Sequence, residues 1–360
     1  MKLSSSGTEI WSFEHSSDDY QLHHDIEYMS NGNILMIAWE YKSYNEAVAA
    51  GRNPSAVDSG TGLYPDKIIE VDSSGNIVWE WHVWDHLIQD YDSTKSNFST
   101  VADHPELIDI NFVTKSPDIT HFNSIDYNEE FDQILVSVHS FSEIWVIDHS
   151  TTTAEAASNT GGKFGKGGDL LYRWGNPEAC GAGTSTDQML YSQHDANWTE
   201  SGYPGEGNIL IFNNGSNLPS GNYSSMEEIT PPVDASGNYT LTAGAAYEPT
   251  ATTWTYNIDS AYYSPNISGA QRLPNGNTLI CSGASGYFLE VDSSGATVWE
   301  HTVSGGTDVF KVQRYGVDYA GLNGLVETGS LAVAISPANA QTAGAQWNIE
   351  GGEWRDPCPV

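Results

Sequence analysis

The feature that most constrains the fold is a repeated stretch of sequence. Residues 70–80 read EVDSSGNIVWE, and residues 290–300 read EVDSSGATVWE. Further upstream, NGNIL at 31–35 is matched by NGNTL at 275–279. Each copy joins strand-forming residues through a tight Asn-Gly or Ser-Gly turn, which is the strongest short-range signal of a β-hairpin. Repetition of a whole unit predicts a chain of similar β-modules.

Four such units can be traced, each an up-and-down meander of four strands. They begin near residues 23, 118, 194 and 267. The sequence therefore predicts an all-β protein, a β-propeller of four-stranded antiparallel blades. Four blades are clear, and we expect five or six in all, with residues 7–14 and 306–320 as remnants of the others. A β-sandwich has the same strand signals but does not account for repetition of whole blades.

The composition of the sequence changes near residue 326. We expect residues 1–325 to form the propeller and residues 326–360 to begin a small β-sandwich-like module, through which the chain could self-associate.

The net charge of the chain makes some classes of binding partner unlikely. The chain carries 13 Lys and Arg against 47 Asp and Glu, a formal net charge of −34. Nucleic acid is disfavoured because binding its phosphates needs a basic surface. No stretch approaches the ~20 apolar residues of a membrane span. The acidic composition is typical of proteins that stay soluble in a salty or extracellular setting, and no signal peptide is visible. We expect a secreted or periplasmic protein.

The candidate active site consists of histidines at equivalent places in the repeat. His24, His121 and His194 each open the first strand of a unit, with Asp25, Asn123 and Asp195 close by. First strands of propeller blades surround a common axis, so we expect the three imidazoles to meet. Imidazole can act as acid, base or nucleophile near neutral pH, and an adjacent polar group can fix its tautomer.

Other interpretations of these residues stay open. Each histidine taken singly could be a hydrogen-bonded structural residue. Together they could form a zinc site, with Asp25 and Asp195 supporting the ligands. Calcium is not indicated, because no Asp-x-Asp-x-Asp-Gly loop is present, and Cys180, Cys281 and Cys358 have no metal-binding spacing. We therefore predict no cofactor.

Several further residues are candidates for substrate binding. Arginine is scarce, so Arg173 and Arg272 stand out as clamps for sulfate, carboxylate or phosphate, with surface or inter-blade ion pairs as the alternative. The tryptophans at 79, 81, 84, 145, 174 and 299 are expected in blade cores. The other candidates are His139, Asn214, Tyr263 and Tyr287.

Long runs of this sequence resemble the arylsulfotransferase (aryl-sulfate sulfotransferase) propellers. They are HHDI at 23–26, VWEWHVWDHLIQ at 78–89, HFNSIDY at 121–127, SEIWVIDHSTT at 142–152, RWGNP at 173–177 and SGAQRLPNGNTLI at 268–280. The resemblance covers about residues 8–325. It implies an exported six-bladed enzyme that moves a sulfuryl group from a phenolic sulfate ester to a phenol without a nucleotide donor. It also implies a transient sulfohistidine, with other histidines and an arginine holding the sulfate; the matching positions are His24, His121 and His194.

The chain departs from that family at three places. Ser216 follows the Phe-Asn-Asn-Gly turn where relatives commonly have arginine, and His139 stands where they often have arginine. No histidine occurs at 283–291, where the family's nucleophile is expected, and Tyr287 lies there instead.

The leading hypothesis is an arylsulfotransferase-like enzyme with a phenolic sulfate donor and a phenol acceptor. His194 or His121 would attack sulfur or act as base, Asn123 and Asp195 would orient the imidazoles, and Arg173 or Arg272 would hold the sulfuryl oxygens. One alternative is a non-catalytic propeller for extracellular binding or assembly. Another is a propeller polysaccharide lyase that uses His and Tyr as acid and base.

Overall fold

A computed structural model describes residues 1–4, 6–303, 308–316 and 319. Residues 13–314 form one compact unit, and the remaining residues are assigned to a second. In the second unit, β1 (Lys2–Leu3) pairs antiparallel with β2 (Glu9–Trp11). The predicted module at 326–360 lies outside the described residues, so that prediction stays untested.

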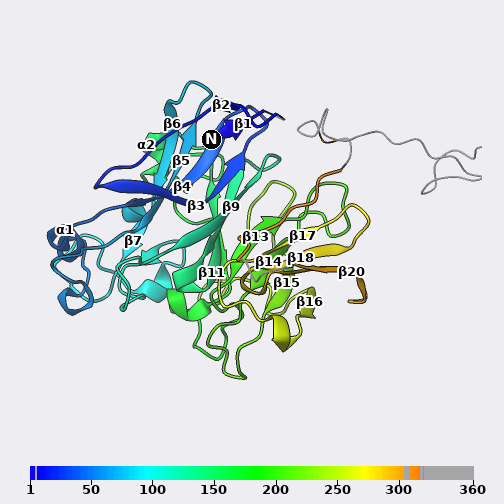
Figure 1. Ribbon diagram of the computed structural model, residues 1–360. Coiled ribbons are helices and arrows are strands. Elements are labelled where there is room, and N and C mark those ends of the chain that lie inside the picture. The colour runs from blue at the N-terminus through cyan, green and yellow to red at the C-terminus, as the bar shows by residue number, and fades with distance from the viewer. Residues whose placement is uncertain (5, 304–307, 317–318, 320–360) are drawn as a thin grey trace, which may run out of the picture. The chain divides into compact units, whose positions relative to one another are not determined.

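The larger unit contains four sheets of four antiparallel strands, each in simple sequence order (Figure 1). This is the architecture of propeller blades, and it confirms the all-β class and the four predicted meanders. The blades are β3 (Tyr20–Tyr28), β4 (Ile34–Glu40), β5 (Asp66–Val71) and β6 (Ile77–His82); β9 (Phe122–Asn128), β10 (Gln133–Val138), β11 (Glu143–Asp148) and β12 (Tyr172–Trp174); β13 (His194–Trp198), β14 (Ile209–Asn213), β15 (Ser225–Ile229) and β16 (Trp254–Asn257); and β17 (Gly269–Arg272), β18 (Thr278–Ser282), β19 (Tyr287–Val291) and β20 (Thr297–Thr302).

The connections between blades carry little regular structure. The inserted loop after β4 holds α1 (Tyr44–Ala49), and the loop after β11 holds α2 (Thr153–Ala156). A short parallel pair joins β7 (Leu87–Ile88) to β8 (Ile108–Asp109). Neither helix of the described chain is long and apolar enough to cross a membrane. The described residues 308–316 contain no strand, so the fifth or sixth blade expected there is not found within that part.

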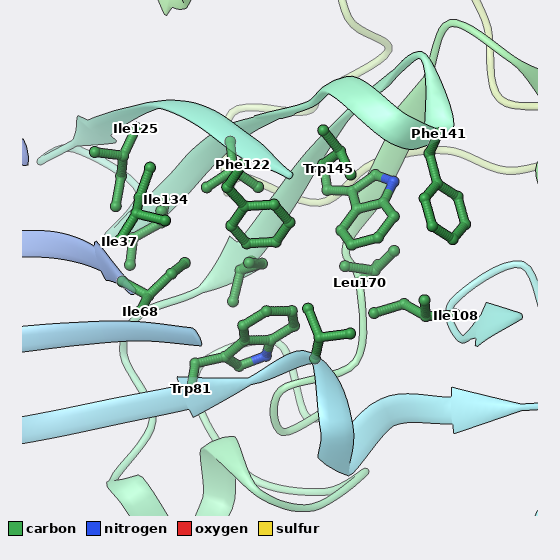
Figure 2. Close-up of a cluster of buried hydrophobic side chains, with 14 of the residues drawn as sticks. Ile37, Ile68, Trp81, Ile108, Phe122, Ile125, Ile134, Phe141, Trp145 and Leu170 are labelled. Carbon is green, nitrogen blue, oxygen red and sulfur yellow. The ribbon is translucent and has the colours of Figure 1, made fainter. Parts of the chain in front are cut away.

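The largest core fills the space between the first two blades. Trp81 and Phe122 stack with ring centroids 6.3 Å apart, and Phe122 meets Trp145 edge-on at 5.7 Å (Figure 2). All three side chains are fully buried. Burial of large rings supplies most of the stabilisation between neighbouring blades. The expected core positions of the tryptophans hold at 79, 81, 145 and 174, but Trp299 is wrong, because it lies on β20 and is 43% exposed.

One hydrogen bond recurs between the first strands of neighbouring blades. A side-chain oxygen on one first strand accepts a backbone N–H from the next: Asp25 from Ile125 at 3.3 Å, Ser124 from Ala196 at 2.9 Å, and Asp195 from Ala270 at 3.0 Å. The last contact requires Gly269, where an added Cβ would lie 2.2 Å from the Asp195 carboxylate. These bonds fix β3, β9, β13 and β17 side by side, and so place the histidines on or next to them. His121 precedes β9 and His194 begins β13, but His24 lies in the middle of β3 rather than at its start, where it was expected.

Candidate functional site

Five histidines from three blades form one continuous group, which we call the histidine cluster: His23, His24, His121, His139 and His194. Ring centroids lie 4.9 Å apart for His23 and His24, and 4.6 Å apart for His24 and His121. The series continues from His121 to His139 at 5.1 Å and from His139 to His194 at 5.5 Å. The structure therefore brings together the three predicted catalytic histidines and the secondary candidate His139. His23 was not predicted.

Left-handed backbone at the strand entries makes this convergence possible. His24, His121 and Asp195 have φ of 53°, 55° and 52°. In a regular strand, consecutive side chains point to opposite faces, and a bulge with one left-handed residue breaks that alternation. The pairing register shifts between Leu22 and Ile26 and between His194 and Asn197. Neighbouring residues can then present side chains in directions that an ideal strand would separate.

His121 lies at the centre of the cluster and is held by a carboxylate. Its Nδ1 lies 2.5 Å from Oδ2 of Asp118. Burial alone would lower the pKa of His121, but the hydrogen bond and charge of Asp118 outweigh burial and raise it. His121 thus favours the imidazolium form, with Nδ1 engaged and Nε2 available to the cluster.

The pKa values of His24, His139 and His194 are shifted in the opposite direction, below the usual value for histidine. Burial, followed by the charges of His23 and His121, lowers the pKa of His24 to about 4. Burial and the neighbouring His121 lower the pKa of His139 to about 4. Burial and the charge of His139 lower the pKa of His194 to about 3. At neutral pH these three rings are uncharged, whereas the pKa of the neighbouring His121 is shifted upward.

His194 has both ring nitrogens occupied. Nδ1 lies 2.7 Å from Oδ1 of Asn214, whose amide nitrogen donates to the backbone oxygens of Ser264 and Ile267. Nε2 accepts the backbone N–H of Ile267 at 3.2 Å. Because the ring is also only 4% exposed, it is locked in one tautomer without a free lone pair. Asn214, predicted as a substrate-binding residue, therefore positions His194.

The predicted orienting residues lie elsewhere. The Asn123 amide donates to the backbone oxygen of Gln193 at 2.7 Å. Asp195 accepts from Ala270 and contacts Lys311. The expectation that Asn123 and Asp195 orient imidazoles is wrong, because strand geometry turns both toward the neighbouring blade. Asp118, Asn214 and Asp66 hydrogen-bond to imidazoles of the cluster instead. Of these three, only Asn214 was among the candidates from the sequence, and it was predicted to bind substrate.

A lysine from beyond the last blade reaches the first strands. Lys311 Nζ lies 2.8 Å from Asp25 Oδ2 and 3.5 Å from Asp195 Oδ1. Burial alone would lower the pKa of Lys311, but the two carboxylates raise it. The adjoining Phe310 ring lies 6.0 Å from the His24 ring. Segment 308–314 thus brings an aromatic side chain to the edge of the histidine cluster.

Neither predicted arginine clamp is free to hold sulfate. Arg173 is 2% exposed and donates to Glu143 from Nε, at 3.0 Å, and from a terminal nitrogen, at 2.5 Å. Arg272 donates to Glu228 and lies over the Trp254 ring, 5.2 Å from its centroid. Both residues are thus in buried ion pairs. The alternative of an inter-blade pair describes Arg272, whose partner lies on β15 of the neighbouring blade, whereas the Arg173–Glu143 pair joins β12 to β11 within one blade.

The two tyrosine candidates also have other partners. The Tyr263 hydroxyl lies 2.9 Å from Ser216 Oγ. Tyr287 donates to Glu300 at 2.7 Å and stacks on Tyr262 with centroids 3.6 Å apart. Neither ring is among the contacts recorded for the five histidines in the described chain.

Within the described ranges, no group of three or more His, Cys, Asp or Glu side chains is arranged so that it could hold a metal ion. The described cysteines, Cys180 and Cys281, are buried free thiols.

Comparison with known proteins gives one strong match. Residues 1–318 match the family described as Arylsulfotransferase (ASST). No curated protein matches. Among solved structures, a protein of unknown function from Bacteroides caccae is 13% identical with a TM-score of 0.42, over 82% of this chain and 71% of that one. Virginiamycin B lyase from Staphylococcus aureus is 9% identical with a TM-score of 0.33, over 80% of this chain and 61% of that one. At these scores neither structure carries an argument about function.

Proposed function

Because the chain belongs to the arylsulfotransferase family, we propose that it transfers a sulfuryl group from a phenolic sulfate ester to a phenol, with His24 as nucleophile and His121 as proton donor and acceptor. The observation that supports this assignment is a pair of imidazoles 4.6 Å apart whose pKa values move in opposite directions. Neighbouring groups with separated pKa values divide naturally into a nucleophile or base and an acid.

His24 suits the nucleophile because it is neutral at physiological pH and keeps access to solvent, even though the neighbouring rings partly desolvate it. A neutral imidazole has a lone pair, whereas a protonated one has none. His24 lies at the surface of the cluster, while His194 is buried with both nitrogens occupied. This assignment replaces the earlier choice of His194 or His121 as the attacking group.

The proposed reaction has two displacements at sulfur. In the first, the His24 lone pair forms an N–S bond, the S–O bond to the aryl group breaks, and the departing oxygen takes the proton of His121. In the second, the acceptor phenol gives its proton to His121 while its oxygen forms a bond to sulfur, and the N–S bond breaks. His24 regains its lone pair, and His121 regains its charge, so the enzyme is restored.

Charge and aromatic surface near the two rings suit the proposed donor. The imidazolium of His121 would face the sulfuryl oxygens, a role that Arg173 and Arg272 cannot fill from their ion pairs. The Trp39 ring lies 6.2 Å from both His24 and His121, and Phe310 lies 6.0 Å from His24. An aryl group can pack against such rings.

The pH dependence of donor cleavage follows from these two pKa values. His24 must be neutral, so kcat/KM for 4-nitrophenyl sulfate should rise as pH increases through about 4. His121 must be protonated, so kcat/KM should fall as pH exceeds the raised pKa of that residue. We expect a bell-shaped profile. A profile flat from pH 3 to pH 10 would contradict the assignment.

Asp118→Asn should shift the alkaline limb of that profile to lower pH. The substitution removes the charge that raises the His121 pKa while retaining a side chain of similar shape. We expect a loss of roughly 10- to 100-fold in kcat/KM above neutral pH, greatest for donors with poor leaving groups, which most need the acid. Unchanged alkaline behaviour in the variant would show that Asp118 does not act through His121.

The proposal is tested directly by incubating the protein with 4-nitrophenyl sulfate, with and without phenol. Phenol-dependent release of nitrophenol, together with formation of phenyl sulfate, is expected. The pairing of both candidate arginines with glutamates favours one alternative, a non-catalytic propeller for binding or assembly. Absence of turnover with a panel of phenols, together with concentration-dependent self-association in sedimentation, would support that alternative.

A further inference from the structure

The buried carboxylate of Asp66 is linked to the exposed His24 by two successive hydrogen bonds, with His23 between them. His24 Nδ1 lies 2.6 Å from Nδ1 of His23, and His23 Nε2 lies 2.7 Å from Oδ1 of Asp66. The Asp66 side chain, at the start of β5, is inaccessible to solvent, and that of His23 is 5% exposed. Asp66, His23 and His24 thus form a line that runs from the blade interior to the cluster surface.

The proton positions along this line follow from the partners of Asp66. Oδ2 accepts the Thr120 hydroxyl at 2.5 Å and the Phe122 backbone N–H at 2.9 Å. The same hydroxyl accepts the Asp66 backbone N–H at 3.1 Å, which leaves its proton for the carboxylate. Asp66 is therefore an acceptor at both oxygens, and His23 Nε2 must carry a proton to donate to it.

The same reasoning extends to His24. A neutral His23 with its proton on Nε2 has a lone pair on Nδ1. The 2.6 Å contact is then a bond in which His24 Nδ1–H donates to His23 Nδ1. With His23 neutral, His24 therefore carries its single proton on Nδ1, and Nε2 keeps the lone pair; a second proton on His23 would reverse both assignments.

Packing and backbone geometry hold the line in place. The Trp39 indole stacks on the His23 ring with centroids 3.9 Å apart and planes 11° apart. Residues 23 and 24 are consecutive, and in a regular strand their rings would lie on opposite faces. The left-handed φ of 53° at His24 allows the two Nδ1 atoms to face each other.

We propose that Asp66 and His23 are positioning residues that fix His24 in the Nδ1–H tautomer and present its Nε2 to substrate. The proposal rests on the proposed function only in taking His24 as the nucleophile. When Nε2 bonds to sulfur, the His24 ring gains positive charge, and its Nδ1–H bond to His23, supported by the Asp66 carboxylate, becomes charge-assisted. No proton has to move along the line, which follows the logic of an aspartate that orients a catalytic histidine.

The test replaces Asp66 with Asn and observes the histidine tautomers by NMR in ¹⁵N-histidine-labelled protein. The amide nitrogen of Asn can donate to His23 Nε2, which moves the His23 proton to Nδ1 and the His24 proton to Nε2. We expect His24 to change from Nδ1–H to Nε2–H, and kcat/KM for 4-nitrophenyl sulfate to fall by roughly 10²- to 10⁴-fold.

A matched control is available in the same chain. Asp132 Oδ1 lies 2.7 Å from Nδ1 of His149, a histidine outside the cluster. Asp132→Asn should change the His149 signals and leave the His24 tautomer and the activity unchanged. If Asp66→Asn does not fold, a second pair of variants tests the same carboxylate. Thr120→Val removes the hydroxyl that donates to Asp66 and should lower kcat/KM. Thr120→Ser retains that hydroxyl and should leave kcat/KM unchanged.

The outcomes separate this inference from the proposed function. A tautomer change in Asp66→Asn supports the positioning role of Asp66 and His23 even if the wild-type protein has no transferase activity. In that case only the proposed function fails. An Nε2–H tautomer of His24 in the wild-type protein overturns the inference. So does an unchanged His24 tautomer in Asp66→Asn, even where His24→Ala is inactive and the proposed function stands.

Discussion

His24→Ala should reduce phenol-dependent sulfuryl transfer by roughly 10⁴- to 10⁶-fold, because loss of a nucleophile removes the covalent route itself. The residue is exposed at the histidine cluster, and its ring lies 4.6 Å from that of His121. Wild-type protein quenched during turnover of 4-nitrophenyl sulfate should carry one added SO₃ group on the peptide that contains residue 24. The variant should carry none.

The control for this variant is a histidine that pairs with an acid outside the cluster. His104 Nδ1 lies 3.0 Å from Glu106 Oε1. His104→Ala should retain the wild-type rate, which separates loss of the nucleophile from loss of any histidine. Full transferase activity in His24→Ala, or a sulfo group on a different histidine, would refute the assignment.

Glu143→Ala should destabilise the fold by about 3–5 kcal/mol, because it leaves the buried Arg173 guanidinium without its counter-charge. Glu143 is 1% exposed and also accepts the Trp145 indole N–H at 2.7 Å. The backbone oxygens of Pro105 and Leu107 remain as partners of Arg173, but they carry no full charge. Urea unfolding at neutral pH measures the loss as a change in the free energy of unfolding.

A partly exposed ion pair provides the comparison. Lys95 Nζ lies 3.8 Å from Asp92 Oδ2 on the surface. Lys95→Ala should cost less than about 1 kcal/mol, because solvent screens exposed pairs. If Glu143→Ala and Lys95→Ala lowered stability equally, Arg173 would have to be solvated or paired in some other way than the structure shows.

Local sequence patterns determined most of the fold. Asn31-Gly32 and Asn275-Gly276 place tight turns between alternating strands, and both the turn and the strand period are set within a few residues. The four meanders are found where these signals predicted them, from β3 to β20. The entry positions of His24, His121 and His194 follow from the same repeat, so their common location could be predicted once a propeller was assumed.

Only the tertiary structure decided which groups act on those histidines. Asp66 begins β5, which lies two strands away from β3 in the first blade, and its partners Thr120 and Phe122 lie at the start of the second blade. Arg173 pairs with Glu143 on the neighbouring strand, and no local sequence pattern predicts this pairing. Short-range sequence rules fix turns and strand faces, whereas hydrogen-bond partners far apart in the chain depend on how blades pack and on single left-handed residues such as His24. The sequence thus determined where imidazoles would gather. The packing of the blades decided which of them has a raised pKa, which has both nitrogens occupied and which stays exposed.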